Sequence, residues 1–187
     1  ENNEIQHTGS TIDAIDADNN GAIDVLIGSV SISTITMLYN NGNPSYASIL
    51  DQDTHYPSTN TSYNTNSFAS PVFIDVDNDN KRDLIVSTYD NGASNVNNIW
   101  YYKNSKINKL DLTLQQKNFL LDNMIDAGEN SIPCFYDVDG DGLKDMLIGS
   151  GGFRDNTNTV YKLLYYKNAG TTDYPKYVLQ NDDFLNV

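Results

Sequence analysis

The chain has 187 residues and a formal net charge of −14, from 25 Asp and Glu against 11 Lys and Arg. This excess of negative charge disfavours nucleic acid and anionic membranes as partners and favours cations. The single cysteine, Cys134, excludes an internal disulfide framework and a zinc site built from cysteines. No apolar run reaches the length of a membrane-spanning helix, so we expect a soluble chain without direct membrane insertion, its signal peptide, if encoded, already removed.

Three similar segments follow one another along the chain, and the many Tyr, Val, Ile, Thr and Asn residues favour strands joined by turns. Each segment contains a predicted strand, an Asp-rich loop, an apolar strand and an aromatic strand, and the first and third add a short fourth strand. We expect surface loops at residues 52–70, 91–98 and 151–159, and an excursion with a strand or helical turn at 115–128. The predicted strands are 10–15, 24–27, 37–42 and 44–50; 71–74, 83–86 and 100–104; and 132–136, 145–148, 165–170 and 175–179.

The segments recur at a regular spacing. Their loops start at Asp16, Asp75 and Asp137, which are 59 and then 62 residues apart. Four strands in each repeat of about 60 residues are typical of a propeller blade. We therefore predict an all-β fold of four-stranded antiparallel β-propeller blades, one segment over residues 1–187 with repeats at roughly 10–68, 69–130 and 131–187.

The Asp-rich loops, here called loops 1, 2 and 3 with positions numbered from the first Asp, are predicted to bind calcium, up to three ions in all. Calcium takes six to eight oxygen ligands at about 2.3–2.6 Å, and side chains at alternate positions of a tight loop can converge on one ion. Asp or Asn at positions 1, 3, 5 and 9, with the carbonyl at position 7, meets this need. The predicted ligands are Asp16, Asp18, Asn20, Ala22 and Asp24 in loop 1; Asp75, Asp77, Asp79, Lys81 and Asp83 in loop 2; and Asp137, Asp139, Asp141, Leu143 and Asp145 in loop 3.

The loops differ in how completely they match the calcium-binding pattern. Loop 1 has the neutral Asn20 where the others have Asp, so we expect it to be the weakest site and loop 3 to be the most complete. Position 6 requires a left-handed residue, which Gly21 and Gly142 supply and Asn80 approximates. Because the crowded carboxylates repel one another, we expect bound calcium to stabilise the fold.

Competing interpretations of the loops are weaker. An EF-hand requires Glu at position 12 and flanking helices, whereas here Ile27, Val86 and Ile148 stand at that position within apolar runs. A solvated acidic turn that binds no ion is the simplest alternative, and recurrence in three copies argues against it. The spacing of the aspartates fits one shared cation better than the two carboxylates of a glycosidase, so we predict that the chain is not an enzyme.

Three further groups have simple structural interpretations. Cys134 lies on a strand and is predicted to be a buried, inert side chain. Trp100, Tyr101 and Tyr102 are predicted to pack between blades rather than to form a sugar platform. His7 and His55 are predicted to be surface residues.

The loops and the strands after them resemble the FG-GAP or VCBS-type repeats of integrin-like β-propellers, marked by Asp-x-Asp/Asn-x-Asp-Gly-x-x-Asp before an apolar strand and Gly. Residues 137–149 match this pattern fully, residues 75–86 lack both glycines, and residues 16–28 carry Asn20 for one Asp. The resemblance implies a calcium-binding propeller that closes with about six to eight blades. Three blades leave open edges, so we expect further blades of a longer chain, or a protein partner, to cover them.

The run at 119–129 and the Tyr-Tyr-Lys-Asn segments are similar to secreted repeat proteins of Bacteroidota. This implies an extracytoplasmic location: periplasm, outer membrane, cell surface or exterior. The leading hypothesis is a non-catalytic, calcium-stabilised propeller segment that binds a protein or glycan. The alternatives are an accessory, plug-like or cargo protein of an outer-membrane protein secretion (type IX) or gliding complex, and a non-catalytic scaffold of a larger secreted enzyme.

Overall fold

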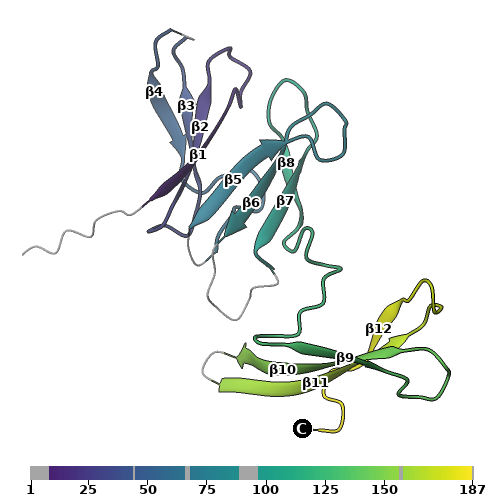
Figure 1. Cartoon of the computed structure of the whole chain (residues 1–187). Coiled ribbons are helices and arrows are strands. Elements are labelled where there is room, and N and C mark those ends of the chain that lie inside the picture. Colours follow the sequence, from purple (N-terminus) through teal and green to yellow (C-terminus); the bar gives the residue numbers. More distant parts are fainter. Residues whose placement is uncertain (1–8, 44, 66–67, 89–96, 156–157, 187) are drawn as a thin grey trace, which may run out of the picture. The chain divides into compact units, whose positions relative to one another are not determined.

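The computed structural model describes residues 9–43, 45–65, 68–88, 97–155 and 158–186. Their strands form three four-stranded antiparallel sheets, each made of consecutive strands (Figure 1). This confirms the predicted all-β fold with four-stranded, propeller-like blades. Within the described ranges there is no α-helix, and no helix long and apolar enough to cross a membrane.

Each sheet follows the same order along the chain, and neighbouring strands in the sequence are neighbours in the sheet. The strands are β1 (Ser10–Ile15), β2 (Asp24–Ser29), β3 (Thr36–Asn40) and β4 (Ile49–Asp53); β5 (Ala69–Ile74), β6 (Asp83–Thr88), β7 (Ile99–Asn104) and β8 (Leu112–Gln116); and β9 (Ile132–Tyr136), β10 (Asp145–Asp155), β11 (Asn158–Asn168) and β12 (Tyr177–Asn181).

The Asp-rich loops are the turns of the first hairpin in each sheet. The last residue of the first strand pairs with the Asp at position 9, as Ile15↔Asp24, Ile74↔Asp83 and Tyr136↔Asp145. Position 9 therefore belongs to the second strand, and its side chain is held by the sheet as well as by the loop.

One predicted connection turned out differently: the expected loop at 151–159 is largely strand, because β10 and β11 continue their pairing past a register shift between Ser150 and Phe153. In the second repeat the fourth strand is β8, which ends inside the excursion predicted at 115–128, and residues 119–123 after it form turns. The Asp122 N–H donates to the Asn118 carbonyl at 3.0 Å, in agreement with the predicted strand or helical turn. Most of the expected loop at 91–98, and His7, lie outside the described residues, whereas His55 is exposed as predicted.

The chain divides into two compact units, Glu1–Met124 (unit 1) and Ile125–Val187 (unit 2). In unit 1 the first two sheets share a core that includes Leu26, Leu84 and Tyr102. Trp100 lies in this core, with its ring centroid 5.2 Å from that of Tyr63. The prediction that Trp100 and Tyr102 are core residues is confirmed.

Close contacts join β1 and β2 to β5 in unit 1. The Thr11 hydroxyl donates to the Ala69 carbonyl at 2.5 Å, and the Phe73 N–H donates to Asp13 Oδ2 at 2.6 Å. A Cβ at Gly28 would lie 1.9 Å from the Ala69 carbonyl oxygen, so only glycine permits this approach. The first two sheets are therefore fixed to each other by polar contacts as well as by apolar packing.

Unit 2 contains one sheet and a smaller core. That core comprises Ala127, Met146, Ile148, Leu164 and Tyr166. The first strand, β9, is exposed along its whole length. The prediction that Cys134 is buried is therefore wrong: it lies on β9 and is exposed, because β9 pairs only with β10 and unit 2 has no second sheet to cover it.

Candidate metal centres

The first Asp of each loop organises the turn through backbone hydrogen bonds. Its Oδ1 accepts from the N–H at position 5 and its Oδ2 accepts from the N–H at position 6. For Asp16 the distances are 3.1 Å from Asn20 and 3.0 Å from Gly21. The corresponding distances are 3.1 and 2.9 Å for Asp75 and 3.1 and 2.9 Å for Asp137. The three loops thus share one backbone conformation.

Two positions in each loop have left-handed backbone. Position 6 has φ of 88° at Gly21, 65° at Asn80 and 86° at Gly142, which confirms the sequence prediction. Position 4 is also left-handed, with φ of 61° at Asn19, 59° at Asn78 and 79° at Gly140. This second position was not predicted, although Asn and Gly, the residues that tolerate such φ, occupy it in all copies.

The Asp at position 9 is fully buried in each repeat: Asp24, Asp83 and Asp145. Its Oδ2 accepts the N–H of position 2, at 2.7 Å in loop 1, 3.1 Å in loop 2 and 3.0 Å in loop 3. Its Oδ1 accepts an N–H from the third strand, at 2.7, 2.8 and 2.8 Å respectively. One carboxylate therefore joins the loop to a strand that comes 16 or more residues later.

The residue that donates from the third strand is an asparagine in all three repeats: Asn40, Asn104 and Asn168, each buried. Its side-chain Oδ1 accepts two N–H groups from the following turn, for example those of Gly42 at 3.0 Å and Ser48 at 2.9 Å. These asparagines lie in the predicted aromatic strands, but no role was predicted for them. Their recurrence at one place in three repeats was the signal that could have identified them.

Burial and charge shift the pKa values around position 9. Desolvation raises the pKa of Asp24, although the N–H groups of Asn40 and Ala17 partly offset this shift. In the other repeats a tyrosine hydroxyl also donates to Oδ2: Tyr101 to Asp83 at 3.3 Å and Tyr165 to Asp145 at 3.2 Å. Burial, followed by the charge of Asp83, raises the pKa of Tyr101 to about 12. These tyrosines therefore keep their protons at physiological pH.

The carboxylates at positions 1, 3 and 9 converge in each loop. One oxygen from each lies within 4.8 Å of the other two, in the groups Asp16, Asp18 and Asp24; Asp75, Asp77 and Asp83; and Asp137, Asp139 and Asp145. Oxygens bound to one calcium ion at about 2.4 Å are at most about 4.8 Å apart. The geometry therefore fits a metal ion in each loop.

The carboxylates at position 5, Asp79 and Asp141, do not belong to these groups. The side-chain oxygen at position 5 instead accepts the N–H of position 7: Asn20 from Ala22 at 2.8 Å, Asp79 from Lys81 at 3.0 Å, and Asp141 from Leu143 at 2.9 Å. The structure thus brings together three of the five predicted ligands in each loop. The other two remain predictions.

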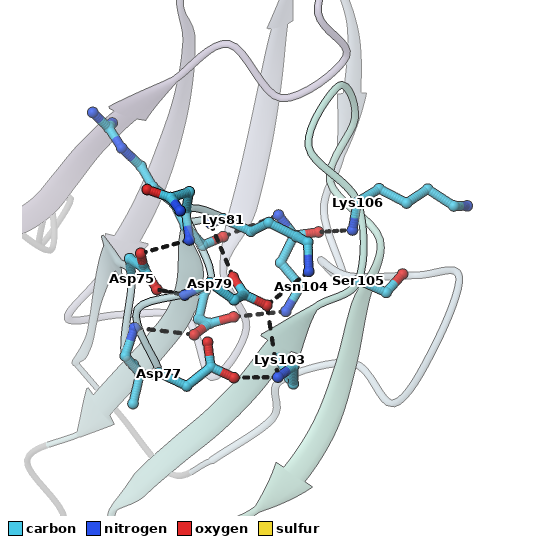
Figure 2. Close-up of polar contacts among 12 residues, drawn as sticks. Asp75, Asp77, Asp79, Lys81, Lys103, Asn104, Ser105 and Lys106 are labelled. Atoms are coloured by element: carbon cyan, nitrogen blue, oxygen red, sulfur yellow. Dashed lines mark hydrogen bonds and ion pairs between the residues drawn. The ribbon is translucent and has the colours of Figure 1, made fainter.

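Lysine side chains contact loops 2 and 3. In loop 2, Lys103 of β7 forms an ion pair with Asp77 and lies 3.7 Å from Asp79, while Lys81 lies 2.7 Å from Asp79 (Figure 2). In loop 3, Lys167 of β11 pairs with Asp139 and lies 3.0 Å from Asp141. The Tyr-Tyr-Lys-Asn segments are visible in the sequence, but the contact of their lysines with the loops was not predicted.

A cavity of about 540 Å³ lies beside loop 1 within unit 1. Its lining includes Asp18, Tyr39, Asp51, Asp53 and Lys109. Burial and the neighbouring charges, of which Asp53 contributes most, raise the pKa of Tyr39 to about 12. The cavity therefore combines an aromatic ring with an excess of carboxylates.

The four-stranded sheets and their Asp-rich hairpin loops have the form of propeller-like blades. Residues 16–86 match the model of the FG-GAP-like repeat family, so the chain carries an FG-GAP-type repeat, as the sequence resemblance indicates. Such repeats are typical of extracellular proteins. No curated protein and no solved structure matches the chain significantly.

Proposed function

We propose that the chain is a non-catalytic, calcium-stabilised segment of an extracytoplasmic β-propeller that binds a protein or glycan partner. The observation that carries this proposal is the threefold recurrence of converging carboxylates in the first hairpin of each sheet. The donors are carboxylate oxygens without His or Cys, a set that suits a hard cation such as calcium. The FG-GAP-type repeat at 16–86 supports both the ion and the location.

The chain's own residues define what the ion would do. The position 9 carboxylate already ties its loop to the third strand. An ion shared by positions 1, 3 and 9 would add the outer carboxylates to this connection and would offset their mutual repulsion. Calcium would therefore stabilise the end of each sheet at which its loop lies, and folding stability would depend on calcium concentration.

Calorimetry and thermal unfolding test the metal role. We expect calcium to release or absorb binding heat and to raise the melting temperature, and EGTA to reverse the rise. Asp139→Asn should weaken one site, whereas Asp173→Asn, an exposed residue outside the loops, should bind calcium as the wild type does. Absence of binding heat together with an unchanged melting temperature in EGTA would contradict the proposal.

The cavity beside loop 1 supports the binding role. Carboxylates and aromatic ring faces are groups that hold sugar hydroxyls or basic side chains. A glycan array and a panel of basic peptides, probed with the wild-type chain and with Asp51→Ala at the exposed end of the lining, test this role. Equal signals from the two proteins would place the binding surface elsewhere.

A further inference from the structure

One strand position next to the loops differs among the three repeats. It directly precedes Asn40, Asn104 and Asn168, whose N–H groups all donate to the Asp at position 9, so the position is structurally equivalent in each sheet. The three residues there are Tyr39 in β3, Lys103 in β7 and Lys167 in β11. The repeats therefore form an internal comparison in which a cation is present twice and replaced once.

The two lysines make the same contacts. Each ammonium group reaches position 3 and position 5 of its own loop: Lys103 contacts Asp77 and Asp79, and Lys167 contacts Asp139 and Asp141. Figure 2 shows Lys103 directed at the carboxylates of loop 2, while Lys106 on the same segment points away. In the described part of the chain, no Lys or Arg forms an ion pair with Asp16, Asp18 or Asp24.

The loops differ in net charge when the paired lysines are counted. Loop 1 has three aspartates and no paired lysine, for a net charge of −3. Loop 2 has four aspartates with Lys81 and Lys103 in contact, which gives −2. Loop 3 has four aspartates with Lys167 in contact, which gives −3. Arg82 and Lys144, at position 8, form no ion pair with these carboxylates among the residues that the structure places.

We propose that Lys103 and Lys167 are internal counterions that compete with calcium for loops 2 and 3, and that loop 2 is the loop that releases its ion first. The proposal rests on the calcium-binding function proposed above. A dication entering loop 2 or 3 must displace the ammonium group or bind beside it, and both outcomes lower the affinity. In loop 1 the equivalent residue, Tyr39, is uncharged and does not compete with calcium. Calcium affinity of such loops follows their charge, so in loop 2 the contacts of Lys81 and Lys103 together outweigh the replacement of one Asp by Asn20 in loop 1.

In the absence of calcium, the same lysines have the opposite effect on stability. Each ammonium group offsets repulsion between two carboxylates of its loop, so it stabilises the calcium-free sheet. Removing the lysine should therefore destabilise the protein in EGTA and strengthen its response to calcium. A lysine that only packs against the sheet would give the first effect without the second.

NMR titration of the full chain with buffered calcium tests the proposal one loop at a time. The amide signals of Gly21, Asn80 and Gly142, all at position 6, report on loops 1, 2 and 3. In the wild type we expect the Asn80 signal to revert first as calcium is lowered. Lys103→Met should raise the calcium affinity of loop 2 about tenfold and leave loop 1 within about twofold. Lys106→Met is the matched control, because Lys106 pairs with Asp111 rather than with the loop.

The outcomes separate this inference from the proposed function. If no loop binds calcium, the proposed function fails. If calcium binds but Lys103→Met leaves loop 2 unchanged, or loop 1 releases its ion first, the counterion role is wrong. Lys167→Met should give the same result in loop 3, and Tyr39→Lys should lower the affinity of loop 1. Thermal unfolding adds an independent readout: Lys103→Met should melt lower than the wild type in EGTA and gain more from calcium.

Discussion

Units 1 and 2 contain the same kind of sheet with the same kind of loop, yet they differ in whether a neighbouring sheet covers the first strand. In unit 1, β5 has alternating buried positions because β1 and β2 pack against it. In unit 2 the corresponding strand, β9, is exposed at every position. The hydrogen bonds of each sheet are therefore set within its own repeat, whereas burial depends on a neighbouring sheet. Four predictions test this difference, from the largest expected effect to the smallest.

The largest effects are expected in the core of unit 1 and at the buried carboxylates of position 9, where substitutions should cost similar free energies. Leu84→Ala removes a fully buried side chain and should lower the free energy of unfolding by about 3 kcal/mol. Ile132→Ala, on β9 with 73% of its surface exposed, should change it by no more than about 0.5 kcal/mol. Urea unfolding followed by Trp100 fluorescence reports on unit 1, and hydrogen exchange reports on unit 2. A cost at Ile132 equal to that at Leu84 would mean that β9 is covered in solution.

The buried carboxylates should behave alike in both units. Asp83→Ala and Asp145→Ala each leave two buried N–H groups without an acceptor, at a cost of about 1–3 kcal/mol for each group. Hydrogen exchange under denaturant measures the loss in each unit, and Asp173→Ala is the surface control. A much smaller cost in unit 2 would show that the loop depends on the neighbouring sheet.

Calcium removal should distinguish the units by their cores. Because unit 2 has one sheet and a small core, EGTA should lower its melting temperature more than that of unit 1. Trp100 fluorescence follows unit 1 during heating, and NMR signals of β10 and β11 follow unit 2. Equal shifts in the two units would indicate that calcium acts independently of core size.

The smallest effect concerns two surface ion pairs, Lys106–Asp111 at 3.0 Å and Lys162–Asp182 at 2.8 Å. The Ser105 hydroxyl and Lys106 lower the pKa of Asp111, and Lys162 lowers that of Asp182. A lowered carboxyl pKa adds stability above the ordinary value of 3.8, and this stability is lost as the pH falls through the lowered pKa. Lys162→Met should therefore shift the melting temperature slightly at pH 7 and not at pH 2. A shift that persists at pH 2 would indicate lost packing instead.

The sequence predicted the parts of the fold that depend on local patterns. The strands on either side of each loop and the left-handed backbone at Gly21 and Gly142 follow from residue type and spacing. The exposure of Cys134 could not be predicted, because it depends on whether another sheet covers β9. The roles of Asn104 and Lys103 were missed for a related reason: their partners lie 21 and 26 residues away, and only the sheet register brings them together.

The buried Asp at position 9 has a consequence for the order of folding. Its hydrogen bonds span 7 residues to the loop and 16 to 23 residues to the third strand. The contacts that join the first two sheets, from Thr11 and Asp13 to β5, span 58 and 60 residues. Contacts with short sequence separation close quickly, since less chain entropy is lost in forming them. We therefore expect the hydrogen bonds within each sheet to form before the contacts that join the first two sheets.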